Sequence, residues 1–402
     1  VRAVNSLMRD NGLANVNVRG GSVDVFNGIL EAAGSQRYVY YLEGTGSRLA
    51  SDYNNVRASG GNNVGGGAGL AAERFLIDWQ MGTALSNDVN SLGYDADFAD
   101  APAMDFHLRS EYGRYDPAVR AFVTNDAATS RLIDMGAPPP QAYSAFGLEP
   151  VPNGDRINVG LYGNTAEASK SSGAPSLIPL TMSDGGTVRG NASLFWSWNG
   201  FDGNEYVNLW FSWNNGETWT NVATHVYISV GSSTGVLWRT TNFISTAQGV
   251  WRVELETDTN VFGQTEIPFA VKNMPLSYYV NDASTNGDVY CSAVGWATNS
   301  GLSAEAPLDS LATLMGRYKV EHGDTVFIDT GVYELSAPLA IQVPAAATNF
   351  LVIQGSSNEA AGGSVITNSG RGAVLDLPYS RGVEWRELRF HGGRTGWTRR
   401  AS

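Results

Sequence analysis

The chain has 402 residues, of which 43% are hydrophobic, 16% are charged and 47 are glycine, and its formal net charge is −13. The large apolar share excludes a wholly disordered chain. The acidic balance argues against nucleic acid as a partner, because phosphate binding needs clustered Lys and Arg. No apolar run approaches the roughly 18 residues that a membrane-spanning helix needs, so we expect no membrane insertion. The length predicts two or three domains, and the glycine content predicts frequent turns.

Short alternating runs separated by Gly and Asn fill residues 1–60, as at Val16 and Val18 and again at Val23 and Val25. Runs of this length and spacing are typical of the turns of a solenoid, in which each strand buries one face against its neighbours. A β-sandwich is the alternative, but its strands are usually longer. We therefore predict that residues 1–170 form part of a coil of parallel strands followed by closing loops.

A glycine run at 65–67 precedes a short helical pattern that places Leu70, Phe75, Leu76 and Trp79 on one face. The run fits the GxGxxA spacing of a dinucleotide-binding loop. However, no hydrophobic strand leads into it and no βαβ unit surrounds it. We therefore predict a flexible turn followed by a helix.

Three segments of residues 88–168 carry a more specific pattern: DFHLRS at 105–110, SRLIDMG at 130–136 and PNGDRINVG at 152–160. They resemble the closing turns of right-handed parallel β-helix domains, which are similar to the pectate-lyase superfold of large secreted bacterial proteins. The usual middle motif is closer to SPxIDAG, so this copy departs from the family pattern. The resemblance implies a fragment of a secreted or cell-surface protein whose signal and anchor lie outside it.

Four carboxylates lie close together in the sequence: Asp95, Asp97, Asp100 and Asp105. Their convergence would suit Ca²⁺, which takes six to eight oxygen ligands. The spacing lacks the DxDxDG order and the trailing Glu of an EF-hand loop, so a solvated acidic loop is the alternative. In β-helix polysaccharide lyases, which the chain resembles, calcium-binding acids and an Arg or Lys base lie on central turns that this fragment lacks. No cofactor is therefore required, and Ca²⁺ is the one that the sequence leaves open.

Residues 177–273 read as an all-β module. We expect seven short strands, at 187–190, 193–198, 206–213, 218–223, 236–240, 250–256 and 266–271. Seven such strands in about 95 residues are typical of a two-sheet sandwich of immunoglobulin type. The pair of cysteines that marks a true antibody domain is missing from this stretch.

A hairpin at 212–219 resembles an Asp-box turn, with Asn214 at the position of the aspartate. A two-residue turn would place Trp219 with Tyr206 and Trp210 on one face of the sheet, as an aromatic platform for a sugar. A three-residue loop would instead turn Trp219 into the core. The Asp-box resemblance favours the second arrangement. Tyr206, Trp210 and Trp219 are the candidate carbohydrate-binding residues.

Residues 278–402 resemble the start of a second parallel β-helix. A helix that places Leu308, Leu311, Leu314, Met315 and Tyr318 on one face would cap the open end of the coil, and GDTVFI at 323–328 would begin its first turn. Strands at 351–354, 365–367, 374–377 and 383–390 continue the pattern. Residues 397–402 break it, and we expect them to be poorly packed.

Other reactive residues are sparse. His107, His225, His322 and His391 are scattered through the sequence, so we expect surface or loop positions without a metal or catalytic function. Cys291 is the single cysteine, which excludes an intrachain disulfide and predicts a small buried apolar residue. We predict no catalytic residue.

These observations favour a non-catalytic scaffold or adhesive segment of a secreted or cell-surface bacterial protein, monomeric as a fragment and in contact with polysaccharide or a cell-surface glycan. One alternative is a polysaccharide lyase or glycoside hydrolase whose catalytic turns lie mostly outside the fragment. The other is a carbohydrate-binding sandwich module. A groove with convergent Arg, Asp and Glu on the coil would favour the enzyme. A row of exposed aromatic residues on the sandwich would favour sugar binding.

Overall fold

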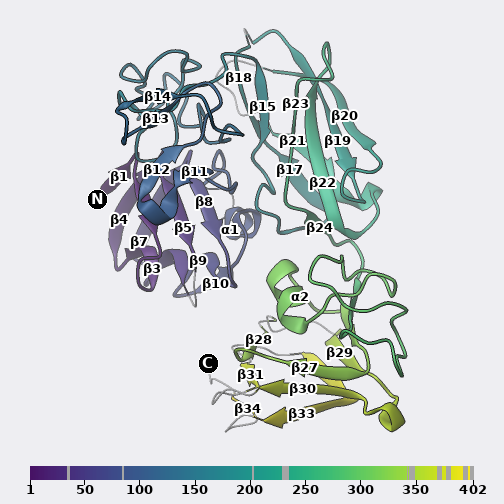
Figure 1. Ribbon diagram of the computed structural model, residues 1–402. Coiled ribbons are helices and arrows are strands. Elements are labelled where there is room, and N and C mark those ends of the chain that lie inside the picture. Colours follow the sequence, from purple (N-terminus) through teal and green to yellow (C-terminus); the bar gives the residue numbers. More distant parts are fainter. Residues whose placement is uncertain are drawn as a thin grey trace. The chain divides into compact units, whose positions relative to one another are not determined.

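The structure is a computed structural model that describes residues 1–33, 37–83, 86–201, 203–228, 235–341, 343, 349–368, 374–376, 382–392 and 397–398. Its contacts divide the chain into two compact units (Figure 1). The first consists of Val1–Phe243 with Gln248–Ala270, and the second of Ile244–Ala247 with Val271–Ser402. The finer division into three domains stays a prediction.

The first unit begins with a parallel β-solenoid, which confirms the coil predicted from the short alternating runs. Its three sheets stack one strand from each turn. They are β1 (Arg2–Val4), β4 (Gly21–Phe26) and β7 (Ser47–Asp52); β2 (Leu7–Arg9), β5 (Ile29–Ala32) and β8 (Asn55–Ala58); and β3 (Ala14–Val18), β6 (Tyr38–Leu42) and β9 (Asn63–Gly67). The side chains that alternate inward, Val25, Val39 and Val56 among them, are fully buried.

The corner between the first and second strand of each turn repeats one backbone conformation, a residue with positive φ. Asn5, Asn27 and Tyr53 occupy equivalent positions there with φ of 49°, 51° and 57°. Asn tolerates this left-handed conformation better than most residues, so two of these three corners use it. The buried amide of Asn54 then closes the corner, since it donates to the carbonyl of Val25 at 2.9 Å and accepts from the Gly28 N–H at 2.7 Å.

The glycine run is part of a strand, which corrects the prediction of a flexible turn. Gly65 lies in β9, and a Cβ there would overlap the ring of Trp79. Trp79 belongs to α1 (Leu76–Gly82), whose Leu76 and Trp79 are buried in the coil. Leu70 is not in this helix. It begins β10 (Leu70–Glu73), which pairs antiparallel with β9 and is partly exposed. The glycines permit close packing of a helix on a strand, a requirement that the local pattern did not reveal.

Residues 88–175 are mostly loops around two small hairpins. These are β11 (Phe98–Asp100) with β12 (Asp105–Leu108), joined through the short 3₁₀ helix η1 (Ala101–Ala103), and β13 (Arg114–Asp116) with β14 (Ala121–Val123). His107 is buried here rather than at the surface, which is a second correction. Its Nδ1 lies 2.6 Å from Oδ1 of Asp105, and its ring stacks on Tyr162 with 3.7 Å between the ring centroids.

The remainder of the first unit consists mainly of antiparallel strand pairs. Its largest sheet has six strands: β16 (Thr187–Val188), β24 (Phe269–Val271), β22 (Thr246–Leu255), β19 (Tyr206–Ser212), β20 (Thr220–Tyr227) and, also paired with β22, β23 (Phe262–Gln264). Two smaller sheets pair β15 (Ser176–Pro179) with β18 (Trp196–Asn199), and β17 (Asn191–Leu194) with β21 (Val236–Arg239), which the 3₁₀ helix η2 (Thr240–Asn242) follows.

An aromatic cluster joins two of these sheets. Trp238 of β21 lies 4.9 Å from Phe211 of β19 and 6.1 Å from Phe269 of β24, as measured between ring centroids. The strand predicted at 193–198 is two strands in the structure, because β17 ends before Phe195 and β18 begins after it, and the two pair with different partners.

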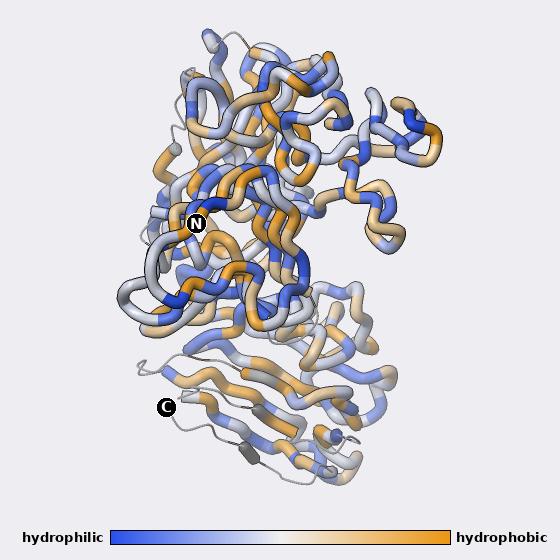
Figure 2. Tube along the Cα trace, turned by 90° about the vertical axis from the view of Figure 1, so that its left-hand side faces the viewer, coloured by the Kyte–Doolittle hydropathy of each residue, from blue (hydrophilic) through white to orange (hydrophobic). Residues whose placement is uncertain are grey.

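The second unit is also a parallel solenoid (Figure 2). Its sheets contain β25 (Ser277–Val280), β26 (Thr325–Ile328), β29 (Leu351–Gly355) and β32 (Val383–Arg386); β27 (Gly331–Glu334), β30 (Ser364–Asn368) and β33 (Leu388–Gly392); and β28 (Leu339–Ala340), β31 (Leu375–Asp376) and β34 (Trp397–Thr398). A third 3₁₀ helix, η3 (Glu359–Ala361), lies between β29 and β30.

Three details of this unit differ from the sequence-based expectations. Residues 397–398 pair with β31 and so continue the coil, whereas 399–402 lie outside the described residues. Leu308 precedes the helix α2 (Leu311–Arg317) and forms a bridge to Val280. Cys291 is partly exposed rather than buried, and its backbone N–H donates to Oδ2 of the buried Asp329 at 2.6 Å.

Candidate functional site

The three predicted aromatic residues lie on one face of the six-stranded sheet. Tyr206 and Trp210 are partly buried on β19, opposite the buried Leu209. Trp219 is not in the core, which corrects the expectation from the hairpin pattern. It is partly exposed, and the guanidinium of Arg252 lies 4.3 Å from its ring centroid. Arg252 is the cross-strand partner of Trp210, so all three rings belong to the same face.

The hairpin explains this outcome. Asn214 Oδ1 accepts from the Thr218 N–H at 2.9 Å, and the Ser212 hydroxyl accepts from the Gly216 N–H at 2.8 Å, so both side chains stabilise the turn. Phe211 and Thr220 are paired across the two strands, and the eight residues between them form a loop. Side chains in a loop do not alternate between the two faces of the sheet as they do in a strand, so the alternation that would place Trp219 in the core does not apply.

The rings of this face already stack on protein groups. Tyr206 lies on His225 with 3.9 Å between the ring centroids, and His225 Nδ1 is 2.9 Å from Oε2 of Glu256. Arg252 lies between Trp219 and Phe262, whose ring centroid is 4.2 Å away. One ring face of Tyr206 and one of Trp219 are therefore occupied, which reduces the area left for a sugar.

The structure brings three of the four predicted acidic residues together. Asp95, Asp97 and Asp100 line a groove of about 510 Å³ beside the β2·β5·β8 sheet of the first coil. Asp105 is the cross-strand partner of Asp100 but is not part of the groove lining, and its carboxylate lies beside His107 and 3.7 Å from Arg114.

The groove also contains basic groups. Its other charged residues are Arg9, Glu31, Arg57 and Arg109. Arg9 pairs with Glu31 at 2.7 Å and Arg57 with Asp95 at 2.5 Å. In the described part of the chain, no three His, Cys, Asp or Glu side chains are placed to hold a metal ion. The calcium site stays a prediction.

The environment separates the pKa values of the carboxylates in this groove. Burial and the charge of Asp95 raise the pKa of Asp97 above its usual value, and burial likewise raises the pKa of Glu31. Burial acts to raise the pKa of Asp95 too, but its bonds to Arg57 and to the Asp97 N–H outweigh that effect and lower it. A pair of neighbouring acids with opposite shifts suits general acid and base roles.

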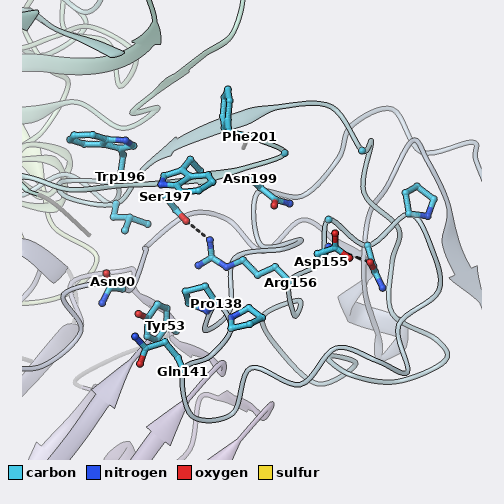
Figure 3. Close-up of a pocket in the computed structure, with 18 of the residues that line it drawn as sticks. Tyr53, Asn90, Pro138, Gln141, Asp155, Arg156, Trp196, Ser197, Asn199 and Phe201 are labelled. Carbon is cyan, nitrogen blue, oxygen red and sulfur yellow. Dashed lines mark hydrogen bonds between the residues drawn. The ribbon is translucent and has the colours of Figure 1, made fainter. Parts of the chain in front are cut away.

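A larger cavity of about 750 Å³ lies between the coil corner, two loops and β18 (Figure 3). Tyr53, Asn90 and Gln141 lie on one side of it, and Trp196 and Phe201 on the other. Its apolar lining consists of Tyr53, Pro138, Pro139, Val151, Pro152, Leu180, Trp196, Trp198 and Phe201. Its polar side chains are Asn90, Gln141, Asn153, Asp155, Arg156, Ser197 and Asn199. We call this space the aromatic cavity.

Arg156 joins the two sides of the aromatic cavity. Its Nη1 donates to the Ser197 hydroxyl at 2.6 Å (Figure 3). Its Nε donates to the Gly136 carbonyl at 2.6 Å, and its Nη2 to the Met135 carbonyl at 3.3 Å. Its side chain is 8% exposed, and burial lowers its pKa to about 10. Because these bonds connect a loop to β18, Arg156 fixes the shape of the cavity.

A second contact closes the wall next to Arg156. Asn199 Nδ2 donates to Oδ2 of the buried Asp134 at 3.0 Å, and burial raises the pKa of Asp134 to about 6. Gly154 covers this pair with a φ of 55°, and a Cβ there would overlap both side chains. Glycine is therefore required at this position.

No sequence pattern indicated the aromatic cavity. Gly154 to Arg156 belonged to a motif that carried the family resemblance, and Trp196 and Trp198 lay in the strand predicted at 193–198. However, Tyr53 lies more than a hundred residues away from them, and no local pattern indicates that these segments meet.

No protein-family model, curated protein or solved structure matches this chain. Among the described residues there is no helix with the length and apolar character needed to span a membrane.

Proposed function

We propose that this chain is a non-catalytic scaffold or adhesive segment of a secreted or cell-surface bacterial protein, and that it contacts polysaccharide through the aromatic cavity. The observation that carries the proposal is the composition of that cavity, in which aromatic rings and prolines stand beside amide side chains. Ring faces pack against the C–H groups of a sugar, and amides bond to its hydroxyls. A volume of about 750 Å³ is in the range of small-molecule sites and has room for a short oligosaccharide.

The finer fold assignment is part of the proposal. We infer that both coils are right-handed and of the pectate-lyase type, that α2 caps the second coil, and that the antiparallel region is an immunoglobulin-like sandwich. The buried Leu311 and Leu314 of α2 support the capping role, since an uncovered coil end exposes apolar side chains and strand edges. The contacts of Trp238 with Phe211 and Phe269 support two layers around one aromatic core.

The test is a binding screen of the intact chain against immobilised plant, bacterial and animal polysaccharides, followed by titration of the best ligand. Trp198→Ala should weaken binding by at least tenfold, because it removes a partly exposed ring from the lining. Trp213→Ala is the matched control, since Trp213 is 43% exposed and lies outside the cavity lining. Equal binding by both variants and the native chain would refute the cavity as the site.

A second candidate function has an observation of its own. The groove lined by Asp95, Asp97 and Asp100, which we call the charged groove, combines Arg, Asp and Glu on the first coil. This is the arrangement expected of a polysaccharide lyase or hydrolase. Incubation with polygalacturonate and Ca²⁺ tests it, with unsaturated products followed by ultraviolet absorbance and new reducing ends measured separately. Product formed by the native chain but not by Asp97→Asn would favour the enzyme over the scaffold.

A further inference from the structure

We propose that the aromatic cavity selects uncharged glycans and discriminates against carboxylated or sulfated ones. This inference rests on the proposed function, and it adds the chemical class of the ligand. Three features of the cavity support it. Amide oxygens of its lining are free to accept hydrogen bonds, its one arginine is already hydrogen-bonded to protein groups, and negative charges lie beside it.

The amide groups that line the cavity offer acceptors. Asn90 donates its Nδ2 to Asp52 at 2.7 Å, and Asn199 donates its Nδ2 to Asp134 at 3.0 Å. Because both partners are carboxylates, which accept hydrogen bonds, the amide oxygens must point the other way. Neither oxygen accepts a hydrogen bond from the described residues, and neither is buried. A sugar hydroxyl can donate to such an oxygen, whereas a carboxylate or sulfate has no proton to donate.

The one basic side chain in the lining is largely used by the protein. Arg156 donates to two backbone carbonyls and to Ser197, which occupies three of its five N–H groups. Its side chain is almost completely buried, so a ligand anion cannot reach it in the planar, two-bond geometry that makes arginine a strong anion receptor.

The charges beside the cavity are negative. Asp155 is an exposed part of the lining, and Asp134 lies behind Asn199. The pKa of Asp134 is about 6, so its carboxyl is mostly ionised at neutral pH, and two acidic side chains stand beside the single Arg156. The chain as a whole carries −13, so its long-range field also repels an acidic ligand.

The aromatic lining is compatible with either class, and the polar groups therefore decide the selectivity. Trp198, Phe201 and Tyr53 are partly exposed, and their rings can stack on any pyranose. This site contrasts with the charged groove, whose lining has three arginines, Arg9, Arg57 and Arg109, beside four carboxylates.

The experiment measures the affinity of the intact chain for matched pairs of oligosaccharides by calorimetry. Each pair shares length and linkage, and one member bears carboxylates or sulfates where the other bears hydroxyls; hexagalacturonate and its carboxyl-reduced form are one such pair. We expect the neutral member to bind at least tenfold more tightly in every pair that binds. Asp155→Asn should reduce this ratio about threefold, and so should 1 M salt, which screens the repulsion.

Three outcomes are distinguishable. A neutral preference that Trp198→Ala abolishes and Asp155→Asn reduces supports the inference. An acidic member that binds as tightly as its neutral partner, with binding still lost in Trp198→Ala, overturns the inference and leaves the cavity as a glycan site. Failure of every pair to bind refutes the cavity itself, and with it both proposals. Trp213→Ala, which should retain the neutral preference, shows that the chain tolerates loss of a tryptophan.

Discussion

The aromatic cavity and the charged groove belong to the same unit, but their charged side chains differ in exposure to solvent and in bonding partners. In the groove, Arg57 and Asp95 form an ion pair close to solvent, with 65% of the Asp95 side chain exposed. In the cavity wall, Arg156 and Asp134 are both buried, and each is bonded mainly to neutral groups. The first arrangement leaves charges available to a ligand. The second uses them to hold the wall together.

This difference shows that the presence of an arginine or aspartate in a lining does not define the ligand. What matters is whether the charged atoms retain free hydrogen-bonding capacity. By this criterion the cavity, whose arginine is bonded within the wall, is suited to a neutral ligand, whereas the groove has charged side chains close to solvent.

The largest effect should come from Gly65→Ala, because it disturbs the coil that supports both sites. The new Cβ would overlap the ring of Trp79, whose side chain is 1% exposed and cannot move without displacing the core. We expect the free energy of unfolding to fall by about 3 kcal/mol, as for other overpacked cores. Denaturant titration measures it. An unchanged midpoint would show that α1 does not pack on β9 in this way.

The buried carboxylate of the cavity wall should make stability depend on pH. The pKa of Asp134 is raised to about 6, so the folded state keeps the proton that the unfolded chain releases near pH 4. Stability is therefore fully present below pH 4 and is lost as the pH rises to about 6, by at most about 3 kcal/mol at 1.36 kcal/mol per pH unit.

Asp134→Asn should remove that dependence, since an amide can accept from Asn199 without a charge. Unfolding free energies at pH 4.5, 6 and 8 for the native and variant chains provide the measurement. Parallel pH profiles for the two chains would contradict the burial of this carboxylate. The corresponding carboxylate of the groove, Asp95, has a lowered pKa, so Asp95→Asn should not produce this flattening.

A more local change is Gly154→Ala, which should affect the cavity without affecting the groove. The added Cβ would overlap the bonded pair of Asp134 and Asn199, and the residue already has a positive φ. We expect neutral oligosaccharide affinity to fall by about tenfold, or about 1.4 kcal/mol, through displacement of the wall. Binding calorimetry measures the loss, and an affinity equal to that of the native chain would contradict the described wall.

The smallest effect should come from Arg57→Gln in the groove. Its ion pair with Asp95 is exposed to solvent, and such pairs contribute at most about 1 kcal/mol. The unfolding free energy should therefore change by less than that amount, and the difference should vanish in 1 M salt. A larger, salt-independent loss would indicate that the groove is part of the structural core.

The sequence predicted the coil of the first unit well, because period-two runs between Gly and Asn corners are a local signal of a turn of parallel strands. Val18 and Val25 illustrate it, since both are buried where the alternation puts them. It predicted less well wherever a distant segment decides the outcome. Gly65 looks like part of a flexible turn until Trp79 lies against it, and Trp219 looks like a core residue until Arg252 stacks on it.

Distant segments also decide which residues meet in the candidate sites. The four aspartates at 95–105 are close in sequence, and yet Asp105 faces His107 while the other three share a groove with arginines from separate turns. The aromatic cavity combines residues from positions 53 to 201, and its geometry depends on Arg156 reaching Ser197. Contacts of this range carry no periodic signal, so only the folded structure reveals them.

The most direct test of the central claim is a calorimetric titration of one neutral oligosaccharide into three proteins: the native chain, Trp198→Ala and Arg57→Gln. We predict that binding is retained by the native chain and by the groove variant, and that it falls at least tenfold in Trp198→Ala. Binding that persists in Trp198→Ala but is lost in Arg57→Gln would contradict the account and would assign glycan recognition to the charged groove.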